Sequence, residues 1–261
     1  MRLFLGIPSA GSPARPFLES LSSLVLPEGI TAFERCVVTG NFIPAERDLI
    51  IEQALAWGAD IVAMCDDDMV LPPHALASLC ALLRSDAAAG IAGALYYSRD
   101  GVRPMVVAGW NAADTTRSWI PAFDDRTPVA VDGVGFGCVA IRATTVARLE
   151  RPLFPAHVFV EHRARRVRVC DEDYLFCERV RHAGYTVLLH PGVRCGHYDR
   201  SRDSVSPPRW ESVEETMHPR VVTYANGSVR LVPLDEAPPT SAREEHRQAA
   251  ITYIHSEYAV E

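Results

Sequence analysis

Apolar positions in the first two-thirds of the chain alternate between short continuous runs and helical spacing. Runs typical of buried strands lie at residues 3–7, 36–38, 61–65 and 91–95. Between these runs, apolar residues recur three or four positions apart, as in Phe17, Leu21 and Leu24, which indicates amphipathic helices. Strands that alternate with helices are typical of a mostly parallel sheet with crossover helices. We therefore expect an α/β fold.

Glycine and proline mark the ends of several predicted helices. The helical pattern over residues 50–57 stops at Gly58, and Pro72-Pro73 opens the next helix, since proline is tolerated in a first turn. A later helix over residues 176–183 ends at Gly184, a typical C-terminal cap. These signals predict short connections between strands and helices.

The pattern changes in two further regions. Between residues 98 and 130 the periodicity fades, which indicates an irregular or β-rich excursion before strands resume at 129–134, 139–141 and 186–189. Near the end, two β-branched runs flank Asn226-Gly227, which is a strong signal for a hairpin, and a helix is expected after Pro238-Pro239. We expect a main domain over residues 1–200 and an extension over residues 201–261 that serves acceptor binding or oligomerisation.

Composition narrows the class of protein. With 261 residues, 48% of them hydrophobic, the chain can bury one substantial core. The net charge of −7 gives no general attraction to nucleic acid or anionic membranes, although residues 162–168 form a local basic stretch. Seven cysteines without a C-x-x-C pair indicate reduced core thiols. The apolar runs are too short to cross a bilayer and strand-like residues follow Met1 directly, so we expect a cytoplasmic protein with no membrane partner.

Three consecutive carboxylates, Asp66, Asp67 and Asp68, follow the apolar run 61–65 directly. Their mutual repulsion is costly unless a cation compensates it, and hard oxygen ligands suit Mg²⁺ or Mn²⁺. The run lies at the carboxyl end of a predicted central strand, where open α/β sheets place ligands. The alternative is a solvated acidic turn before the following helix.

Two further polar groups are candidates for chemistry. Asp171-Glu172-Asp173 precedes a predicted helix, so one carboxylate could act as a general base towards a hydroxyl, or the group could simply cap the helix. His197 follows a predicted strand, and its neutral imidazole could complete a divalent-metal shell or be structural.

A glycine cluster and an arginine are candidates for donor contacts. Residues 133–137 lack the G-x-G-x-x-G order and the Walker lysine. Gly135 and Gly137 could allow close backbone approach to a ligand, or could mark a bulged strand. Arg47 could pair with a diphosphate, or could be an exposed surface residue.

Taken in order, these pieces resemble the GT-A glycosyltransferases of the family 2 type, particularly the short stand-alone versions found in bacteriophage genomes. The matching segments are residues 41–47, 64–73, 131–138, 172–177 and His197. Together they cover roughly residues 1–200 of the order expected for such a domain.

The resemblance implies a Rossmann-like GT-A sheet and a transferase that uses Mn²⁺ or Mg²⁺ and a nucleotide-sugar donor, expected to be a UDP-sugar. Asp68 and His197 would bind the metal, and Asp173, paired with Glu172, would be the catalytic base. The residues expected to contact the donor are Pro8, Arg47, Asp66, Asp67, Gly135 and Gly137. Among them, Asp66 would face the ribose and base, and Asp67 would support its neighbours.

Several alternatives stay open at this level. A sugar-phosphate nucleotidyltransferase could also use metal-binding aspartates, although no early glycine-rich triphosphate loop is present. A non-catalytic carbohydrate- or metal-binding module is a third class. The resemblance to phage proteins makes a hydroxymethylated DNA base a candidate acceptor, in the host cytoplasm, beside glycans and small molecules. The transmembrane helices of many processive family members are missing, so polymer export is not expected.

Overall fold

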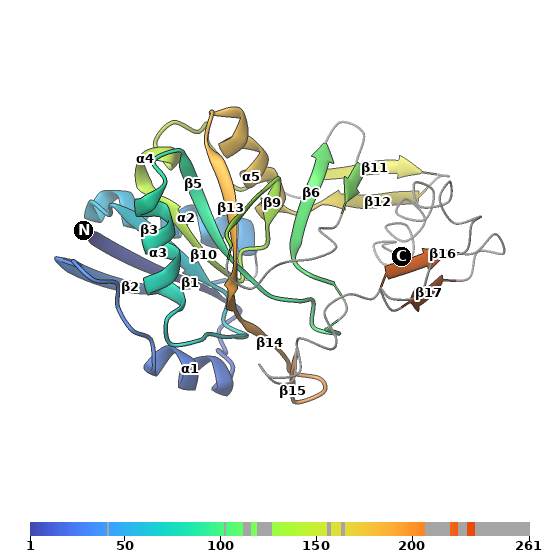
Figure 1. The fold of residues 1–261 in the computed structure, drawn as a ribbon, viewed down its shortest axis with the longest axis horizontal. Helices are drawn as coiled ribbons and strands as arrows, with labels where there is room; N and C mark the ends of the chain where they lie inside the picture. Colours follow the sequence, from blue (N-terminus) through green and yellow to red (C-terminus); the bar gives the residue numbers. More distant parts are fainter. Residues whose placement is uncertain are drawn as a thin grey trace.

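The structure of the chain is a computed structural model. It describes residues 1–40, 42–101, 103–111, 116–118, 127–155, 158–162, 165–206, 220–223 and 229–232. Seven strands form the central sheet seen in Figure 1: β1 (Arg2–Ser9), β2 (Ala32–Thr39), β3 (Ile61–Cys65), β5 (Ala89–Leu95), β8 (Val129–Val131), β10 (Cys138–Arg142) and β13 (Thr186–Arg194). The described helices are α1 (Arg15–Ser22), α2 (Ile43–Trp57), α3 (Ala75–Ser85), α4 (Ala143–Val146) and α5 (Glu172–His182).

The central sheet has the order β2-β1-β3-β10-β5-β13-β8. Strand β1 pairs in parallel with β2 and β3, and β5 pairs in parallel with β13. Strand β10 is antiparallel to both β3 and β5, and β8 is antiparallel to β13. Five strands therefore share one direction, which confirms the predicted α/β fold with a mostly parallel sheet flanked by helices.

Side chains of successive strand residues point to opposite faces, so β1 contributes to two cores. Phe4 packs with α2 and α5 residues on one face, whereas Leu3 and Leu5 pack with α1 and α3 residues on the other. The helix ends also follow the sequence. Gly58 after α2 has a φ of 80°, in the left-handed region that favours glycine. The helix expected to open at Pro72-Pro73 begins at Ala75, with the two prolines in the approach to it.

A small sheet lies beside the carboxyl end of β3. It contains β4 (Met69–Val70), β14 (Gly196–Asp199) and β15 (Ser204–Ser206), in the order β15-β14-β4. His197 of β14 is the register partner of Met69, and the Tyr198 N–H donates to the Asp68 carbonyl oxygen at 2.8 Å. This pairing brings the late histidine next to the acidic run.

The remaining strands form separate pairs and a three-stranded sheet. That sheet contains β6 (Val106–Asn111), β7 (Thr116–Ser118) and β9 (Gly133–Val134), in the order β7-β6-β9, which confirms the predicted β-rich excursion. The two antiparallel pairs are β11 (Val158–His162) with β12 (Arg165–Cys170), and β16 (Arg220–Thr223) with β17 (Val229–Val232).

The last pair confirms the strands of the predicted C-terminal hairpin, whereas Asn226-Gly227 and the predicted terminal helix lie outside the described residues. The basic stretch falls on β11 and β12, a pairing that the sequence pattern did not predict, and Arg163 lies outside the described residues. The division at residue 200 stays a prediction. Among the described helices, none is long and apolar enough to cross a membrane.

Candidate functional site

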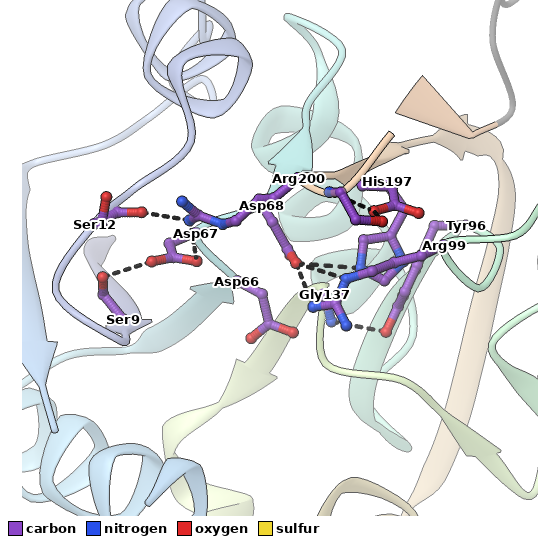
Figure 2. Close-up of polar contacts among 12 residues, drawn as sticks. Ser9, Ser12, Asp66, Asp67, Asp68, Tyr96, Arg99, Gly137, His197 and Arg200 are labelled. Carbon is purple, nitrogen blue, oxygen red and sulfur yellow. Dashed lines mark hydrogen bonds and ion pairs between the residues drawn. The ribbon is translucent and has the colours of Figure 1, made fainter. Parts of the chain in front are cut away.

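The candidate site lies where β1 and β3 end side by side. These two strands are parallel neighbours, and the chain adds β2 on one side of β1 and β3 on the other, so the direction of strand addition reverses here. Ligands of open α/β sheets bind at such reversals. Ser9 ends β1, and its Oγ donates to Asp67 Oδ2 at 2.5 Å (Figure 2). The acidic run therefore lies where the sequence pattern predicted it.

Each aspartate of the run is paired with its own arginine. The pairs, with their N–O distances, are Arg47–Asp66 (3.0 Å), Arg200–Asp67 (3.5 Å) and Arg99–Asp68 (2.5 Å). Three guanidinium groups therefore lie against the three carboxylates, although Arg47 is shared with Glu172. These ion pairs offset part of the charge repulsion within the run, which the argument from sequence assigned to a metal ion alone.

Arg47 connects the acidic run to the second carboxylate group. Its guanidinium lies on α2, is only 4% exposed, and donates from Nη1 to Glu172 Oε1 at 2.7 Å. Burial disfavours its charge, but the carboxylates of Asp66, Glu172 and Asp173 outweigh burial and raise the pKa of Arg47. The alternative of an exposed surface arginine is wrong, because this side chain is a buried bridge.

The first and third aspartates differ in their pKa. Burial raises the pKa of Asp66, and the nearby charge of Arg47 offsets this only in part. Burial also opposes ionisation of Asp68, but hydrogen bonds from His197 and Arg99 lower its pKa to about 2. Asp68 is therefore fully ionised at neutral pH.

Asp68 and His197 form the pair of side chains that could hold a metal. The Tyr97 carbonyl can only accept, so the 2.9 Å contact assigns a proton to His197 Nδ1. The other nitrogen, Nε2, lies 3.4 Å from Asp68 Oδ2, where it donates to Asp68 when it carries a proton and could bind a metal ion when it does not. Two ligands bound to one ion at about 2.1 Å lie roughly 3–4 Å apart, so this spacing fits a shared Mg²⁺ or Mn²⁺. The backbone hydrogen bond on the other ring nitrogen is typical of metal-ligating histidines.

The described residues contain no group of three or more His, Cys, Asp or Glu side chains arranged to hold an ion. Of the residues that the structure describes, two would therefore serve as ligands. A small hard cation that keeps positions for phosphate oxygens and water fits such an incomplete shell.

Glu172 and Asp173 open α5, and both are buried. The N-cap residue Asp171 makes no capping hydrogen bond through its side chain, whereas Glu172 and Asp173 are first-turn acids of the kind that helix N-termini favour, so the roles as catalytic base and as helix cap both stay predictions. Asp173 Oδ1 accepts the Tyr174 N–H at 2.8 Å. Burial, together with the neighbouring carboxylates of Glu172 and Asp171, raises the pKa of Asp173 well above its ordinary value.

The two glycines make room for Tyr96. A Cβ at Gly135 would lie 2.2 Å from Tyr96 Oη, and a Cβ at Gly137 would lie 2.7 Å from Tyr96 Cζ. The Gly137 N–H donates to Tyr96 Oη at 3.0 Å, and its carbonyl accepts the Asp66 N–H at 3.1 Å. These glycines shape the wall beside the acidic run, and Pro8 is buried in β1 next to Ser9. Donor contact by Pro8, Gly135 and Gly137 stays a prediction.

Five residues at the site were not singled out from the sequence: Ser9, Glu46, Tyr96, Arg99 and Arg200. Ser9 and Tyr96 lie at the carboxyl ends of β1 and β5, so the positional rule that selected the acidic run could have found them. Glu46 is buried on α2, where Oε2 accepts the Ser9 N–H at 3.0 Å. The two arginines carry no comparable signal, because loop geometry decides their pairing.

Comparison with known proteins agrees with this geometry. The model of the family described as "Glycosyltransferase like family 2" matches residues 45–217. Among solved structures, A197 from STIV is 16% identical, with a TM-score of 0.57 over 92% of this chain and 98% of that one. GalNAc-T7, solved with UDP, GalNAc and Mn²⁺, is 11% identical, with a TM-score of 0.52 over 76% of this chain and 43% of that one.

These two structures support the fold alone, because proteins so low in sequence identity to this chain give no evidence of a shared activity. No curated protein matches the sequence. A particular likeness to bacteriophage members stays a prediction. The family match covers most of the described core, including α2 from Ala45 onward, the acidic run, Glu172-Asp173 and His197. The chain belongs to the glycosyltransferase-like family 2 and has the α/β fold of the GT-A type.

Proposed function

We propose that this protein transfers a sugar from a nucleotide-diphosphate sugar to an acceptor hydroxyl with the help of a divalent metal. The observation that carries this proposal is the double contact of Arg47 with Asp66 and Glu172. It joins two carboxylate clusters, far apart in the sequence, at one edge of the sheet. Sugar transfer needs the groups that bind the donor and the group that accepts the hydroxyl proton to lie close together, because donor and acceptor have to meet in one site.

On the donor side, Asp66 faces the nucleoside, and Asp68 with His197 holds the metal. Bound Mn²⁺ or Mg²⁺ supplies Lewis acidity to the departing diphosphate. The 3.4 Å approach of His197 Nε2 to Asp68 Oδ2 supports this assignment. GalNAc-T7, which shares the fold, was solved with UDP, GalNAc and Mn²⁺, and this supports a UDP-sugar and Mn²⁺.

On the acceptor side, Asp173 is the general base. In a direct displacement, the acceptor oxygen bonds to the anomeric carbon while the bond from that carbon to the diphosphate oxygen breaks. The electron pair leaves with the nucleoside diphosphate, and the hydroxyl proton passes to the Asp173 carboxylate. The raised pKa of Asp173 makes its ionised form a better proton acceptor than an ordinary aspartate. Arg47 positions the adjacent Glu172 by its hydrogen bond.

The acceptor is proposed to be a hydroxymethylated DNA base or a glycan. The basic stretch on β11 and β12 supports the first of these, because lysine- and arginine-rich segments contact phosphates. Residues 201–261 lie beyond the proposed catalytic domain and are proposed to contact the acceptor or a second subunit.

The test is a panel of nucleotide sugars incubated with the protein and Mn²⁺, with donor cleavage and transfer measured by mass spectrometry. We expect cleavage of one donor, and a loss of about 10²- to 10⁴-fold in Asp173→Asn. Glu178→Gln, on the same helix, is the matched control and retains the rate. Release of pyrophosphate from UTP plus a sugar phosphate would instead establish a nucleotidyltransferase.

A further inference from the structure

The three arginines at the acidic run differ greatly in exposure. Arg47 is 4% exposed, Arg200 is 47% exposed and Arg99 is 60% exposed. A buried arginine between two carboxylates is fixed, because moving it would leave unpaired charges in the interior. An exposed arginine is not held in this way. Arg99 is therefore the cation of the run that can most easily exchange one anion for another.

Arg99 occupies the carboxylate oxygen that faces His197. Its Nη2 and Nε lie 2.5 and 3.2 Å from Asp68 Oδ2, and His197 Nε2 lies 3.4 Å from the same oxygen. A carboxylate oxygen has two lone pairs, so these three nitrogens already surround it. A metal ion that binds between Asp68 and His197 through Oδ2 has to displace Arg99.

The turn that carries Arg99 is firmly hydrogen-bonded. The Ser98 N–H donates to the Arg103 carbonyl oxygen at 2.7 Å, and the Gly101 N–H donates to the Ser98 carbonyl oxygen at 2.7 Å. The Arg103 N–H also donates to Ser98 Oγ at 3.1 Å. These hydrogen bonds join the described residues of the turn on both sides of Arg99, so rotation of the long Arg99 side chain is sufficient for the exchange.

We propose that Arg99 is a diphosphate-binding residue that occupies the cation position on Asp68 until the donor arrives. On donor binding, Arg99 moves from Asp68 to the diphosphate oxygens, and Asp68 with His197 becomes available to the metal. A guanidinium suits this role because its planar fork matches phosphate oxygens. The inference rests on the proposed function, and it makes metal binding depend on the nucleotide diphosphate.

The experiment measures the Kd of Mn²⁺ from the electron paramagnetic resonance signal of the free ion, with and without UDP. Without UDP, Arg99→Gln is expected to bind Mn²⁺ about tenfold more tightly than the wild type, because the competing cation is gone. UDP is expected to raise the Mn²⁺ affinity of the wild type about 100-fold, and that of Arg99→Gln about tenfold, within the usual range of coupling between sites. By reciprocity, Mn²⁺ is expected to raise the affinity for UDP about 100-fold in the wild type and about tenfold in Arg99→Gln.

Arg200→Gln is the matched control, because it removes an exposed arginine from the neighbouring Asp67. Without UDP it is expected to change the Kd of Mn²⁺ less than about threefold, since it frees no oxygen of Asp68. Thermal unfolding checks that the variants fold. Equal Mn²⁺ affinity of wild type and Arg99→Gln without UDP, equal enhancement by UDP in both, or no Mn²⁺ binding in either overturns the proposal.

Sugar transfer is measured separately on the wild type. If the Mn²⁺ and UDP affinities follow the expected pattern but no donor sugar is cleaved or transferred, the exchange by Arg99 stands and the proposed function fails. If sugar is transferred but Arg99→Gln has the Mn²⁺ and UDP affinities of the wild type, the proposed function stands and the exchange is rejected.

Discussion

Asp66 and Asp68 are two positions apart, yet their surroundings shift their pKa values in opposite directions. Asp66 shares a single arginine with another carboxylate, and burial dominates. Asp68 receives hydrogen bonds from Arg99 and His197, which overcome burial. At the scale of the residue, ionisation is therefore decided by which donors reach each carboxylate, and the uniform acidic run becomes two distinct groups.

The low pKa of Asp68 predicts a pH-dependent contribution to stability. A carboxylate whose pKa is about 2 in the folded protein and about 3.9 in the unfolded chain contributes about 2–3 kcal/mol to stability at pH values above both pKa values. This contribution is lost as the pH falls from about 4 towards about 2. In EDTA at neutral pH, Asp68→Asn is expected to lower the free energy of unfolding by up to that amount.

Urea denaturation at a series of pH values measures this difference. The gap between wild type and Asp68→Asn is expected to narrow below about pH 4, where the wild-type carboxylate begins to lose its advantage. Glu34→Gln, at an exposed position on β2, is the control and stays near the wild type. A gap that is independent of pH would contradict the assigned pKa.

The raised pKa of Asp173 predicts the position of the acid limb in the pH profile of kcat/KM. The base has to be ionised, so kcat/KM rises with pH through the pKa of Asp173, which lies above the ordinary value of about 3.9. Glu172→Gln removes a carboxylate that raises this pKa, so the limb is expected to move to lower pH. Asp173→Asn is expected to lose the limb, and Glu178→Gln is expected to retain it. An unmoved limb in Glu172→Gln would argue against Asp173 as the titrating base.

At the scale of elements, the segment from β9 to β10 is shaped by Tyr96, which follows β5. Gly135→Ala would place its Cβ against Tyr96 Oη, so we expect destabilisation by about 1–3 kcal/mol from overpacking. Tyr96→Phe removes that oxygen and costs about 1–3 kcal/mol, because the buried Gly137 N–H loses its acceptor. In the double variant the clash with the hydroxyl oxygen is gone. The double variant is therefore expected to lose less free energy of unfolding than the sum of the losses in the two single variants.

Chemical denaturation of the four proteins in this double-mutant cycle measures the coupling. Gly137→Ala is the contrasting variant, because its Cβ meets Tyr96 Cζ and Met69 Sδ rather than the hydroxyl. Tyr96→Phe is therefore not expected to rescue it. Additive costs for Gly135→Ala and Tyr96→Phe would refute the steric argument.

The β11–β12 pair carries the basic stretch, and the proposed DNA acceptor predicts binding through it. We expect the affinity for duplex DNA to fall with rising salt, and to fall further when Arg165 and Arg166 are replaced by alanine. The control replaces two exposed arginines elsewhere, Arg15 and Arg35, with the same loss of charge. Fluorescence anisotropy measures both. Binding that is absent or independent of salt would favour a glycan acceptor.

The elements were more predictable than their arrangement. Periodicity predicted the run at 61–65, and β3 has those bounds, because five consecutive apolar residues can be buried on both faces of a central strand. The same pattern predicted a strand at 139–141 but not its antiparallel position between β3 and β5. Register and direction depend on contacts between distant segments, which the local pattern does not contain.

The site followed the same division. Asp66 and His197 stood out because of their residue types at the ends of strands, whereas Arg99 and Arg200 are ordinary arginines in loops. Arg99 pairs with Asp68 because a turn after β5 directs it there, and Arg200 reaches Asp67 and the Ser12 carbonyl from beyond β14. The local sequence around these arginines does not predict which distant carboxylate they contact.

At the scale of the whole molecule, Arg47 links α2, the end of β3 and the start of α5. Replacing it by methionine leaves the buried Glu172 and the half-buried Asp66 without their shared cation. Removal of one partner from a buried ion pair typically costs about 3–5 kcal/mol, so Arg47→Met is expected to lose that much free energy of unfolding. Arg47→Lys is expected to lose less, because it keeps the charge but cannot donate to both carboxylates in the same planar geometry.

The cause can be separated from lost packing by neutralising the stranded carboxylates. Adding Asp66→Asn and Glu172→Gln to Arg47→Met is expected to recover part of the loss, because the two carboxylates that Arg47 contacts directly then carry no charge, and only Asp173 nearby keeps its carboxyl group. Asp48→Asn, on the same helix, is the control for α2. Its loss of free energy of unfolding is expected to be smaller than the free energy of unfolding that the triple variant regains relative to Arg47→Met. Guanidinium denaturation measures all of these proteins. If the triple variant is no more stable than Arg47→Met, the packing of the Arg47 side chain and its cation–π contact with the Phe136 ring would account for the loss in place of its two ion pairs.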